Sequence, residues 1–501
     1  MRSHKRLWLA ASLAAVLVGS LGLRARARQA EEERDEAEHS QPALTIYNGN
    51  FAVVRQMLPL DLRPGVNDIQ FTEVTGQLEP DSVMLRDPSG SRLLQVLEQN
   101  YRNDPVSPEM LLSLNEGKVL DFRTTQNGKE VIVKGRVLRS GWAAGRSYAQ
   151  PIVEVNGQLQ FGLPGQPLFP QLGSESILKP QLTWALRTDK PGAFDAEVAY
   201  ITGGMSWHAD YNVVAPEKGD TVDIVGWVTI DNQSGKTFDH ARIKLMAGDV
   251  NKIQPGAVGG MRDYAAKQAA MEASAAPVVT EKAFDEFHLY TLERAVTLHD
   301  HETKQVEFVS AQGVASQRLY VYDGALIPNY YGWSYENIRN DHSYGTQSNP
   351  KIWVMQEFKN TAANHLGMPL PKGRLRFYRR DSDGRLEFTG ENLIDHTPKD
   401  ETVRVYTGNS FDLVGERKRT DYKINVDQMW ADESFEIHVR NHKKEAVEVR
   451  VVEHLYRGPN WTIKLKSNDY NKLDANTVEF PVKVRPDGEA VVTYTVHYSW
   501  N

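Results

Sequence analysis

Two segments of this chain combine imidazole and carboxylate side chains in a pattern that could do chemistry. At the first, His299, Asp300, His301 and Glu302 are side chains of the kind that zinc and other divalent ions bind. In a strand, His299 and His301 would share one face while Asp300 would point away, and no third ligand follows at a recognisable spacing. The pattern therefore favours an exposed turn, and the sequence predicts no metal and no cofactor.

The second place is the motif GGMSWHADY at residues 203–211, where Trp207, His208, Asp210 and Tyr211 follow two glycines. The glycines permit a bulge that could aim an aromatic ring into the core or toward a partner. An inward Trp207 with Tyr211 on its face explains the motif without a ligand, and a binding surface is the alternative. His208 and Asp210 could form an acid–base pair, but no nucleophile is placed beside them.

A third candidate is an aromatic segment with little strand alternation, residues 329–345. Its rings belong to Tyr330, Tyr331, Trp333, Tyr335 and Tyr344. Rings on a loop give a large, rigid contact area that suits sugars and protein partners alike. They could equally fold back over an open sheet edge. Glu336 and Asp341 would be the carboxylates of a glycoside hydrolase, which needs two facing carboxyls at a defined separation.

The composition removes several classes of chemistry. The 501 residues include no cysteine, which excludes disulfides, thiolate nucleophiles, iron–sulfur clusters and Cys-ligated zinc. The formal net charge of -7 gives nucleic-acid phosphates no basic field to meet, so nucleic-acid binding is disfavoured. No zincin helix, nucleophile elbow or phosphate-binding glycine loop occurs in the chain.

The first residues have the pattern of an export signal. Basic residues precede the apolar run 7–23, and cleavage after Ala27 fits the small-x-small rule. Arginines follow the run directly, and positive charge on that flank opposes translocation and could leave residues 1–27 as an uncleaved anchor. Residues 28–42 look like a charged linker. We expect a periplasmic or extracellular protein that meets a membrane only through this first segment, and the oligomeric state stays open.

From Leu44 onward, apolar residues mostly alternate with polar ones between turn signals, which predicts an all-β, multidomain β-sandwich protein with few helices. In the first β domain, residues 43–180, short strands and NG turns predict a small SH3-like barrel at about 106–172. One short helix is expected after Ser107, which would be its N-cap. A β-sandwich domain at 181–290 with a flexible Ala-rich insertion at about 256–280 and a C-terminal β-sandwich region at 291–501 complete the chain.

Two basic runs lie in the C-terminal half, RFYRRD around Arg379 and GERKRTDYK around Arg417. Such runs could contact acidic polysaccharide or anionic lipid headgroups. Because acidic residues are mixed among them, an ordinary solvated sheet face is the favoured interpretation.

Several motifs follow one another in a fixed order along the chain. They are GGMSWHADY (203–211), GWVTIDNQSG (226–235), LMAGDVN (245–251), DHETKQVE (300–307), WVMQEFKN (353–360), MPLPKGRLRFY (368–378), FDLVGERKR (411–419) and WTIKLKSN (461–468). On these motifs, residues 43–501 resemble the bacterial domain-of-unknown-function family 4139, which also takes in mucoidy-inhibitor-like proteins. The resemblance implies no catalytic residues and a loose link to the cell envelope or exopolysaccharide. His208 and His301 depart from the family pattern.

These observations lead to the hypothesis of a non-enzymatic, exported β-scaffold that binds or organises cell-envelope components. Its partner would be envelope polysaccharide or another envelope protein, contacted through the aromatic segment and the Trp207 motif. One alternative is a carbohydrate-active hydrolase that uses carboxylates of the C-terminal half, which product release would reveal. Another is a periplasmic ligand-binding subunit, for which a ligand would raise the melting temperature.

Overall fold

The computed structural model describes residues 41–103, 107–141, 150–170, 177–248, 250–252, 279–327 and 334–500. Strands dominate these ranges, so the predicted all-β class is confirmed. The predicted export segment, nearly all of the charged linker and most of the Ala-rich insertion lie outside the described residues. Within the described residues, no helix is both long and apolar enough to cross a membrane.

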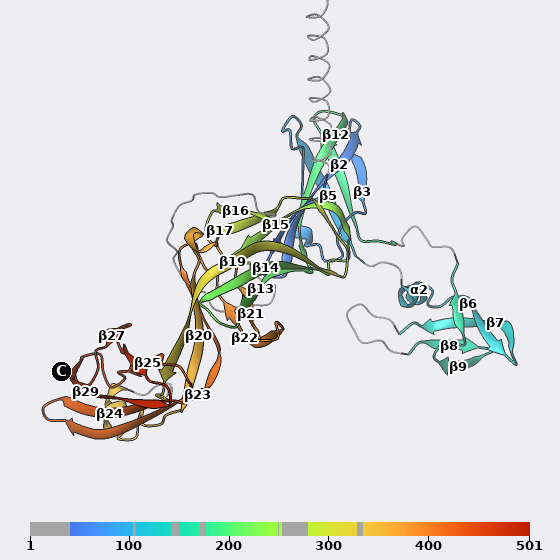
Figure 1. Ribbon diagram of the computed structural model, residues 1–501. Coiled ribbons are helices and arrows are strands. Elements are labelled where there is room, and N and C mark those ends of the chain that lie inside the picture. Colours follow the sequence, from blue (N-terminus) through green and yellow to red (C-terminus); the bar gives the residue numbers. More distant parts are fainter. Residues whose placement is uncertain are drawn as a thin grey trace, which may run out of the picture.

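The N-terminal part of the fold is a sandwich of two sheets (Figure 1). The larger sheet runs in the order β16 (Val279–Phe284), β17 (Phe287–Leu292), β15 (Phe238–Ala247), β1 (Ala43–Tyr47), β2 (Phe51–Leu62), β12 (Gly192–Gly203) and β4 (Met84–Arg86), and β18 (Val296–Leu298) pairs with β15. The smaller sheet has the order β3 (Asn67–Phe71), β11 (Gln181–Thr188) and β5 (Leu94–Arg102). A 3-10 turn, η1 (Pro80–Ser82), precedes β4. Strands from both sides of residue 180 share the larger sheet, so the boundary expected there is not a boundary between sheets.

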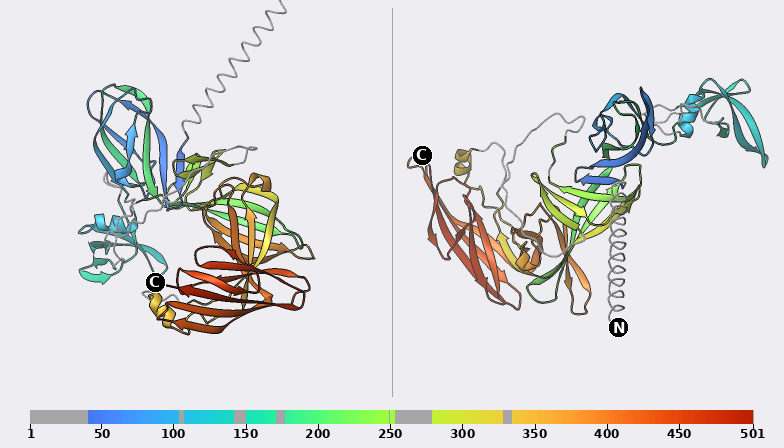
Figure 2. Two further views of the ribbon diagram at one scale, coloured as in Figure 1. Left: turned by 90° about the vertical axis from the view of Figure 1, so that its left-hand side faces the viewer. Right: turned by 90° about the horizontal axis from the view of Figure 1, so that it is seen from above.

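A separate five-stranded antiparallel sheet stands away from the rest of the molecule (Figures 1 and 2). Its order is β10 (Gln166–Leu168), β6 (Val119–Gln126), β7 (Lys129–Arg139), β8 (Ile152–Val155) and β9 (Gln158–Phe161), and helix α2 (Pro108–Leu114) precedes it. As predicted, the hydroxyl of Ser107 caps α2 by accepting from the backbone N–H of Met110 (3.1 Å). Asn127 and Gly128 both have positive φ (51° and 75°), the geometry that suits a two-residue hairpin turn. In the described residues, β9 and β10 are the edge strands of this sheet, and no pairing between them closes it into the predicted barrel.

The rest of the fold is one continuous sheet of thirteen strands. Its main path is β22 (Leu386–Ile394), β21 (Gly373–Arg380), β13 (Met205–Ala215), β14 (Thr221–Asn232), β19 (Glu302–Asp323), β20 (Lys351–Lys359), β23 (Thr402–Asn425), β24 (Trp430–Asn441), β29 (Gly488–Ser499) and β26 (Trp461–Lys466). Off this path lie β25 (Val447–His454), β27 (Asn471–Lys472) and β28 (Thr477–Val484). Because β14 pairs with β19, the boundary expected near residue 290 runs through this sheet.

The first seven strands of that path, β22 to β23, curve round until β22 lies against β23. The amide of Asn392 donates to the carbonyl oxygen of Tyr406 (2.9 Å) across this contact. Gly390 allows the close approach, because a Cβ there would stand 2.2 Å from the carbonyl oxygen of Thr407. We call these seven strands the central strand ring. Apolar side chains such as Ile224, Phe358 and Leu375 fill its interior.

The last strands form a C-terminal sandwich with its own apolar core (Figure 1). The second halves of β19 and β23 extend from the central strand ring into this sandwich, where they pair with β25 and β24. Helix α3 (Tyr335–Asn340) lies in the connection between β19 and β20, and the 3-10 turn η2 (Ala362–Asn364) follows β20. The connection after β19, which contains α3, therefore lies on the C-terminal sandwich.

Candidate functional site

The Trp207 motif lies inside the fold. It occupies β13, where Trp207 and Tyr211 are buried (2% and 1% exposed). The indole N–H of Trp207 donates to the carbonyl oxygen of Met246 (3.2 Å), and the hydroxyl of Tyr211 donates to that of Pro371 (2.7 Å). Both rings are core residues with satisfied polar atoms, so neither offers a binding surface.

His208 and Asp210 point to the other face of β13, as the alternation of a strand requires. Nε2 of His208 lies 3.1 Å from Oδ2 of Asp210. The same carboxylate accepts from the hydroxyl of Thr229 (3.0 Å) and from Nη1 of Arg376 (3.3 Å). The hydroxyl of Thr229 thus donates to Asp210 and not to the imidazole. The arrangement is a polar cluster on a sheet face, without an alcohol that His208 could activate.

The residues His299 to Glu302 form the connection from β18 to β19. Oε2 of Glu302 accepts from the backbone N–H of His299 (2.7 Å), and Oδ1 of Asp300 accepts from that of Gly235 (2.9 Å). His301 has a φ of 60°. The carboxylates are occupied with backbone N–H groups, which makes this segment a hydrogen-bonded turn.

The described part of the aromatic segment begins at Ser334, and Tyr330, Tyr331 and Trp333 lie outside the described residues. The hydroxyl of Ser334 caps α3 by accepting from the backbone N–H of Asn337 (3.3 Å). Tyr335 on α3 is 47% exposed, whereas Tyr344 is buried. The segment therefore contributes one ring to the surface and one to the interior.

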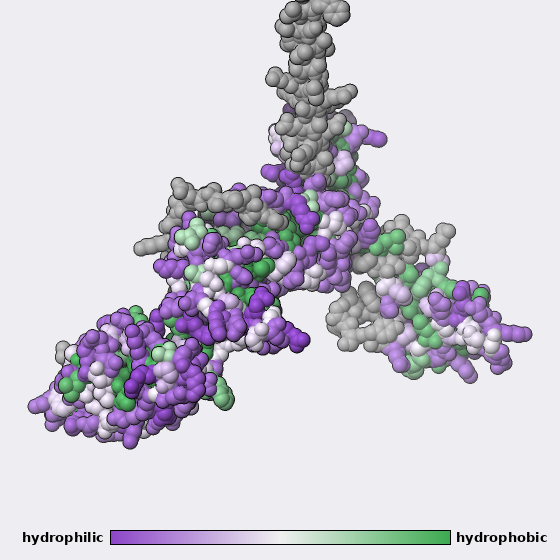
Figure 3. Space-filling view, viewed as in Figure 1, coloured by the Kyte–Doolittle hydropathy of each residue, from purple (hydrophilic) through white to green (hydrophobic). Residues whose placement is uncertain are grey.

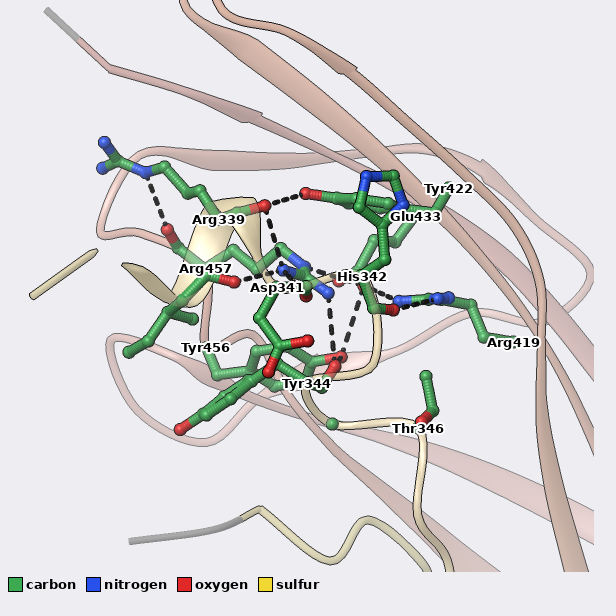
Figure 4. Close-up of polar contacts among 12 residues, drawn as sticks. Arg339, Asp341, His342, Tyr344, Thr346, Arg419, Tyr422, Glu433, Tyr456 and Arg457 are labelled. Carbon is green, nitrogen blue, oxygen red and sulfur yellow. Dashed lines mark hydrogen bonds and ion pairs between the residues drawn. The ribbon is translucent and has the colours of Figure 1, made fainter. Parts of the chain in front are cut away.

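A buried arginine holds the backbone of this segment (Figure 4). The side chain of Arg457 is fully buried, and its guanidinium donates to the carbonyl oxygens of Ile338, of Asp341 (3.2 Å) and of Tyr344 (3.2 Å). Nε of Arg457 lies 2.8 Å from Oε1 of the buried Glu433. One side chain thus satisfies carbonyl groups at the end of α3 and in the turn after it, where a helix leaves such groups unpaired.

A second buried ion pair, between a residue of β23 and a residue of β25, supports the same segment. Nε of Arg417 donates to Oε1 of Glu453 (2.8 Å), and both side chains are fully buried. Nη1 of Arg417 donates to the carbonyl oxygen of Gly345 (2.7 Å), and the hydroxyl of Tyr494 donates to Glu453 (2.5 Å). The expectation that the GERKR run is a solvated face is wrong for Arg417, which is 4% exposed, and holds for the exposed Lys418 beside it.

The carboxylates of this cluster form ion pairs with arginines of the same chain. Burial raises the pKa of the Glu433 carboxyl above its ordinary value, although Arg457 and Arg419 act against this rise. For Arg417, desolvation disfavours the charged form, but Glu453 raises the pKa above its ordinary value. Neither Glu433 nor Glu453 is exposed, so neither can exchange a proton with a solvent-borne substrate. The cluster positions a segment of chain and does not form a reacting centre.

The two carboxylates considered for hydrolysis, Asp341 and Glu336, have different surroundings. Oδ1 of Asp341 accepts from both the backbone N–H and the hydroxyl of Ser343 (2.7 Å each). These bonds hold the pKa of Asp341 below its ordinary value, whereas a general acid needs a raised one. Glu336 is exposed on α3 and has no ion-pair partner among the described residues.

The anchored segment brings aromatic rings from distant parts of the chain to one place. The guanidinium of Arg339 lies 4.2 Å from the ring centroid of Trp500 and 5.6 Å from that of Tyr335. The rings of His342 and Tyr422 meet edge to face with centroids 4.9 Å apart. We call Tyr335, His342, Tyr422 and Trp500 the aromatic surface. Flat rings fixed by cations are suited to stacking on sugars or on a protein partner.

Sequence reasoning missed the buried carboxylates, although the strand pattern contains a signal for them. Glu433 occupies an inward position of β24 between Ala431 and Phe435, and Glu453 continues the inward row of β25 after Val451. A carboxylate on the apolar face of a strand must find a cation in the interior. No such pattern marks Arg457, which lies beyond the end of β25.

A scan against protein-family models and a search of the curated proteins find no match. The resemblance to family 4139 therefore stays a prediction.

The contact between His454 and Asp323 predicts a pH dependence of stability. Nε2 of His454 lies 3.0 Å from Oδ2 of Asp323, and this hydrogen bond raises the pKa of the imidazole. The stabilisation by this contact is therefore complete at pH values below the pKa of the imidazole in the unfolded chain, about 6.5. It is lost as the pH rises through the higher pKa of the imidazole in the folded protein. The pair is partly solvated, so the expected loss is less than about 1 kcal/mol.

Urea titrations between about pH 6 and pH 9 measure this slope. Asp323→Asn is expected to flatten it, whereas Asp427→Asn makes the same charge change at an exposed turn and is expected to leave it unchanged. His438, whose pKa is raised by Glu436 and then by Glu489, contributes a slope of the same sign that both variants retain. An identical slope in the parent and in Asp323→Asn would contradict the assignment.

Proposed function

We propose that this chain is a non-enzymatic, extracytoplasmic β-scaffold that binds cell-envelope polysaccharide through the aromatic surface. The observation that carries the proposal is the use of two buried arginines, Arg417 and Arg457, to hold the backbone of residues 338–345. Burying a charge is costly unless it is paired and hydrogen-bonded, so fixing this segment is expensive in free energy. A fixed segment loses less conformational entropy on binding than a flexible one, which favours a binding role.

The class of ligand follows from the chemistry of the surface. Tyr335 and His342 are exposed, whereas Tyr422 and Trp500 are half-buried, and the cation of Arg339 lies over Trp500. Sugars stack on such rings while their hydroxyls accept from cations. The extracytoplasmic location is the one that the N-terminal segment predicts, and envelope polysaccharide is the polymer that such a protein meets.

Co-sedimentation with insoluble bacterial cell-wall polysaccharide, freed of protein, tests the proposal. The chain is expected to sediment with the polysaccharide, and Tyr335→Ala combined with Trp500→Ala is expected to weaken binding by about tenfold or more, since two stacking contacts are lost. Phe161→Ala removes a ring that is 74% exposed on the separate five-stranded sheet and serves as the matched control.

Equal sedimentation of the double variant and the parent would contradict the proposal. So would the release of soluble sugar fragments that Asp341→Asn or Glu336→Gln abolishes while the fold is retained. Sedimentation only in the presence of envelope proteins would indicate a protein partner instead.

A further inference from the structure

A cavity of about 230 Å³ lies at the end of the central strand ring where β13 and β21 finish. Each of the seven strands of the ring contributes to its wall. The polar residues of its lining are Arg318, Gln356, Tyr378, Arg379, Thr389, Thr407 and Asn409. Sites for drug-sized ligands span about 300–1,000 Å³, so this cavity suits a small ion or one functional group of a larger molecule.

Arg379 is held in place at the wall of this cavity. Nη1 of Arg379 donates to the carbonyl oxygens of Pro216 (2.7 Å) and Glu217 (3.2 Å). These bonds use one nitrogen of the guanidinium, and the remaining N–H groups of its fork meet no acceptor among the described residues. The side chain is half-buried, so its charge is only partly solvated.

Arg318 brings a second positive charge to the same cavity from β19. It forms no hydrogen bond or ion pair within the described chain, and it is exposed at the rim. Burial, and after it the charge of Arg318, lower the pKa of Arg379, as expected for two cations at one cavity.

No carboxylate of the described residues forms an ion pair with these two arginines. Glu387 stands opposite Arg379 in the pairing of β21 with β22 but forms no ion pair with it in the described chain. Glu357 is bound to Arg404 (2.5 Å). By contrast, Arg376, three positions before Arg379 on β21, contacts both Asp210 (3.3 Å) and Glu391 (3.6 Å). The cavity arginines therefore differ from their neighbour in having no anionic partner among the described residues.

Uncharged groups complete the lining. Tyr378 and Asn409 also belong to the lining, and the side chain of neither forms a hydrogen bond with the described residues. Gly408 has a φ of 152°, and a Cβ there would meet nothing within 4 Å. The wall thus combines two arginines with uncharged polar residues.

We propose that this end of the central strand ring is a binding site for an oxyanion, with Arg318 and Arg379 as its cationic ligands. Guanidinium groups bind carboxylate, sulfate and phosphate through paired N–H bonds, and such charge-assisted bonds are the strongest hydrogen bonds a side chain makes. The oxyanion is either a free ion or the carboxylate of an acidic sugar. The site is separate from the aromatic surface and does not depend on its function.

Isothermal titration calorimetry on the full chain at low ionic strength tests the site, with inorganic phosphate, sulfate and glucuronate as probes and neutral glucose as the blank. Saturable binding of at least one anion is expected, because each probe places an oxyanion between the two cations. Arg318→Gln and Arg379→Gln are each expected to weaken it by about tenfold or more, which matches the loss of one charge-assisted hydrogen bond. Binding of glucuronate alone identifies the carboxylate of an acidic sugar, and binding of phosphate or sulfate identifies a free tetrahedral ion.

Arg385→Gln is the matched control, because it removes the same charge from the β21–β22 hairpin at a side chain that is 82% exposed and pairs with Asp383. Arg318 is exposed and forms no hydrogen bond or ion pair with the described residues, so Arg318→Gln keeps the test valid even if Arg379→Gln is unstable. Absence of binding for all three anions overturns the proposal. Equal weakening by the control variant also overturns it, since that result indicates only general electrostatic attraction.

Discussion

Arg417→Met is expected to lower the free energy of unfolding of the C-terminal sandwich by about 3–5 kcal/mol, the cost of leaving a buried charge without its partner. The substitution removes the cation that binds Glu453 (2.8 Å) in an interior where both side chains are fully buried. It also leaves the carbonyl oxygen of Gly345 without its donor. Methionine has a flexible apolar side chain that fills most of the vacated space, so the electrostatic loss dominates over the packing loss.

The double variant Arg417→Met with Glu453→Gln separates the charge from the packing. Glutamine is neutral and can still accept from the hydroxyl of Tyr494, so most of the lost stability is expected to return, to within about 2 kcal/mol of the parent. Lys418→Met is the matched control, since it makes the same kind of change at the exposed neighbouring position and is expected to shift stability by no more than about 0.5 kcal/mol.

Urea unfolding followed by tryptophan fluorescence measures the three variants, and amide hydrogen exchange at residues 338–345 reports the anchored segment directly. The chain has several cores, so the comparison applies to the transition of the C-terminal sandwich. If the double variant were as unstable as Arg417→Met, an unpaired charge would not be the cause of the loss.

Much of the local structure could be predicted from the sequence. Strand β24 alternates buried and less buried positions over its whole length, and its inward row contains Phe435, Ile437 and Val439. A period of two in the apolar residues is sufficient to predict such a strand. Short turns could be predicted equally well, because Asn156 and Gly157 adopt the positive φ values that their residue types favour.

The pairing of distant strands could not be predicted in this way. β1 pairs in parallel with β15, so that Ala43 stands beside Arg242. No residue pattern in either segment identifies the other as its partner. The same holds for the contact of β22 with β23 that completes the central strand ring. Long-range pairing depends on the sum of many side-chain contacts and on register, which one sequence does not display.

The candidate sites were harder to predict than the strands because a charged residue is ordinarily expected at the surface. Arg417 and Arg379 lie in basic runs that suggest a solvated face, yet one is in the core and the other lines a cavity. Their environments depend on Glu453 and on the carbonyl of Pro216, each far away in the sequence. A charged residue is buried when distant groups satisfy it, and this information is three-dimensional.

Trp207→Ala is expected to cost about 3–5 kcal/mol of stability, as deletion of a fully buried tryptophan does in other cores. The ring of Trp207 packs against Tyr290, with centroids 6.1 Å apart, and it is part of the core shared by the N-terminal sandwich and the central strand ring. Its loss leaves a cavity and removes the indole N–H that donates to the carbonyl oxygen of Met246. Trp207→Phe keeps most of the apolar contact and loses the hydrogen bond, so it is expected to cost about 1–3 kcal/mol.

Thermal and urea unfolding of both variants measures these losses, and His208→Ala provides the matched control. His208 is the next residue on β13 but faces solvent, and Asp210 keeps Arg376 and Thr229 as partners when the imidazole is removed. The control is expected to change stability by less than about 1 kcal/mol. If Trp207→Ala left stability unchanged and instead abolished the sedimentation with polysaccharide, the ring would have to reach the surface, and the core role derived from its burial would be wrong.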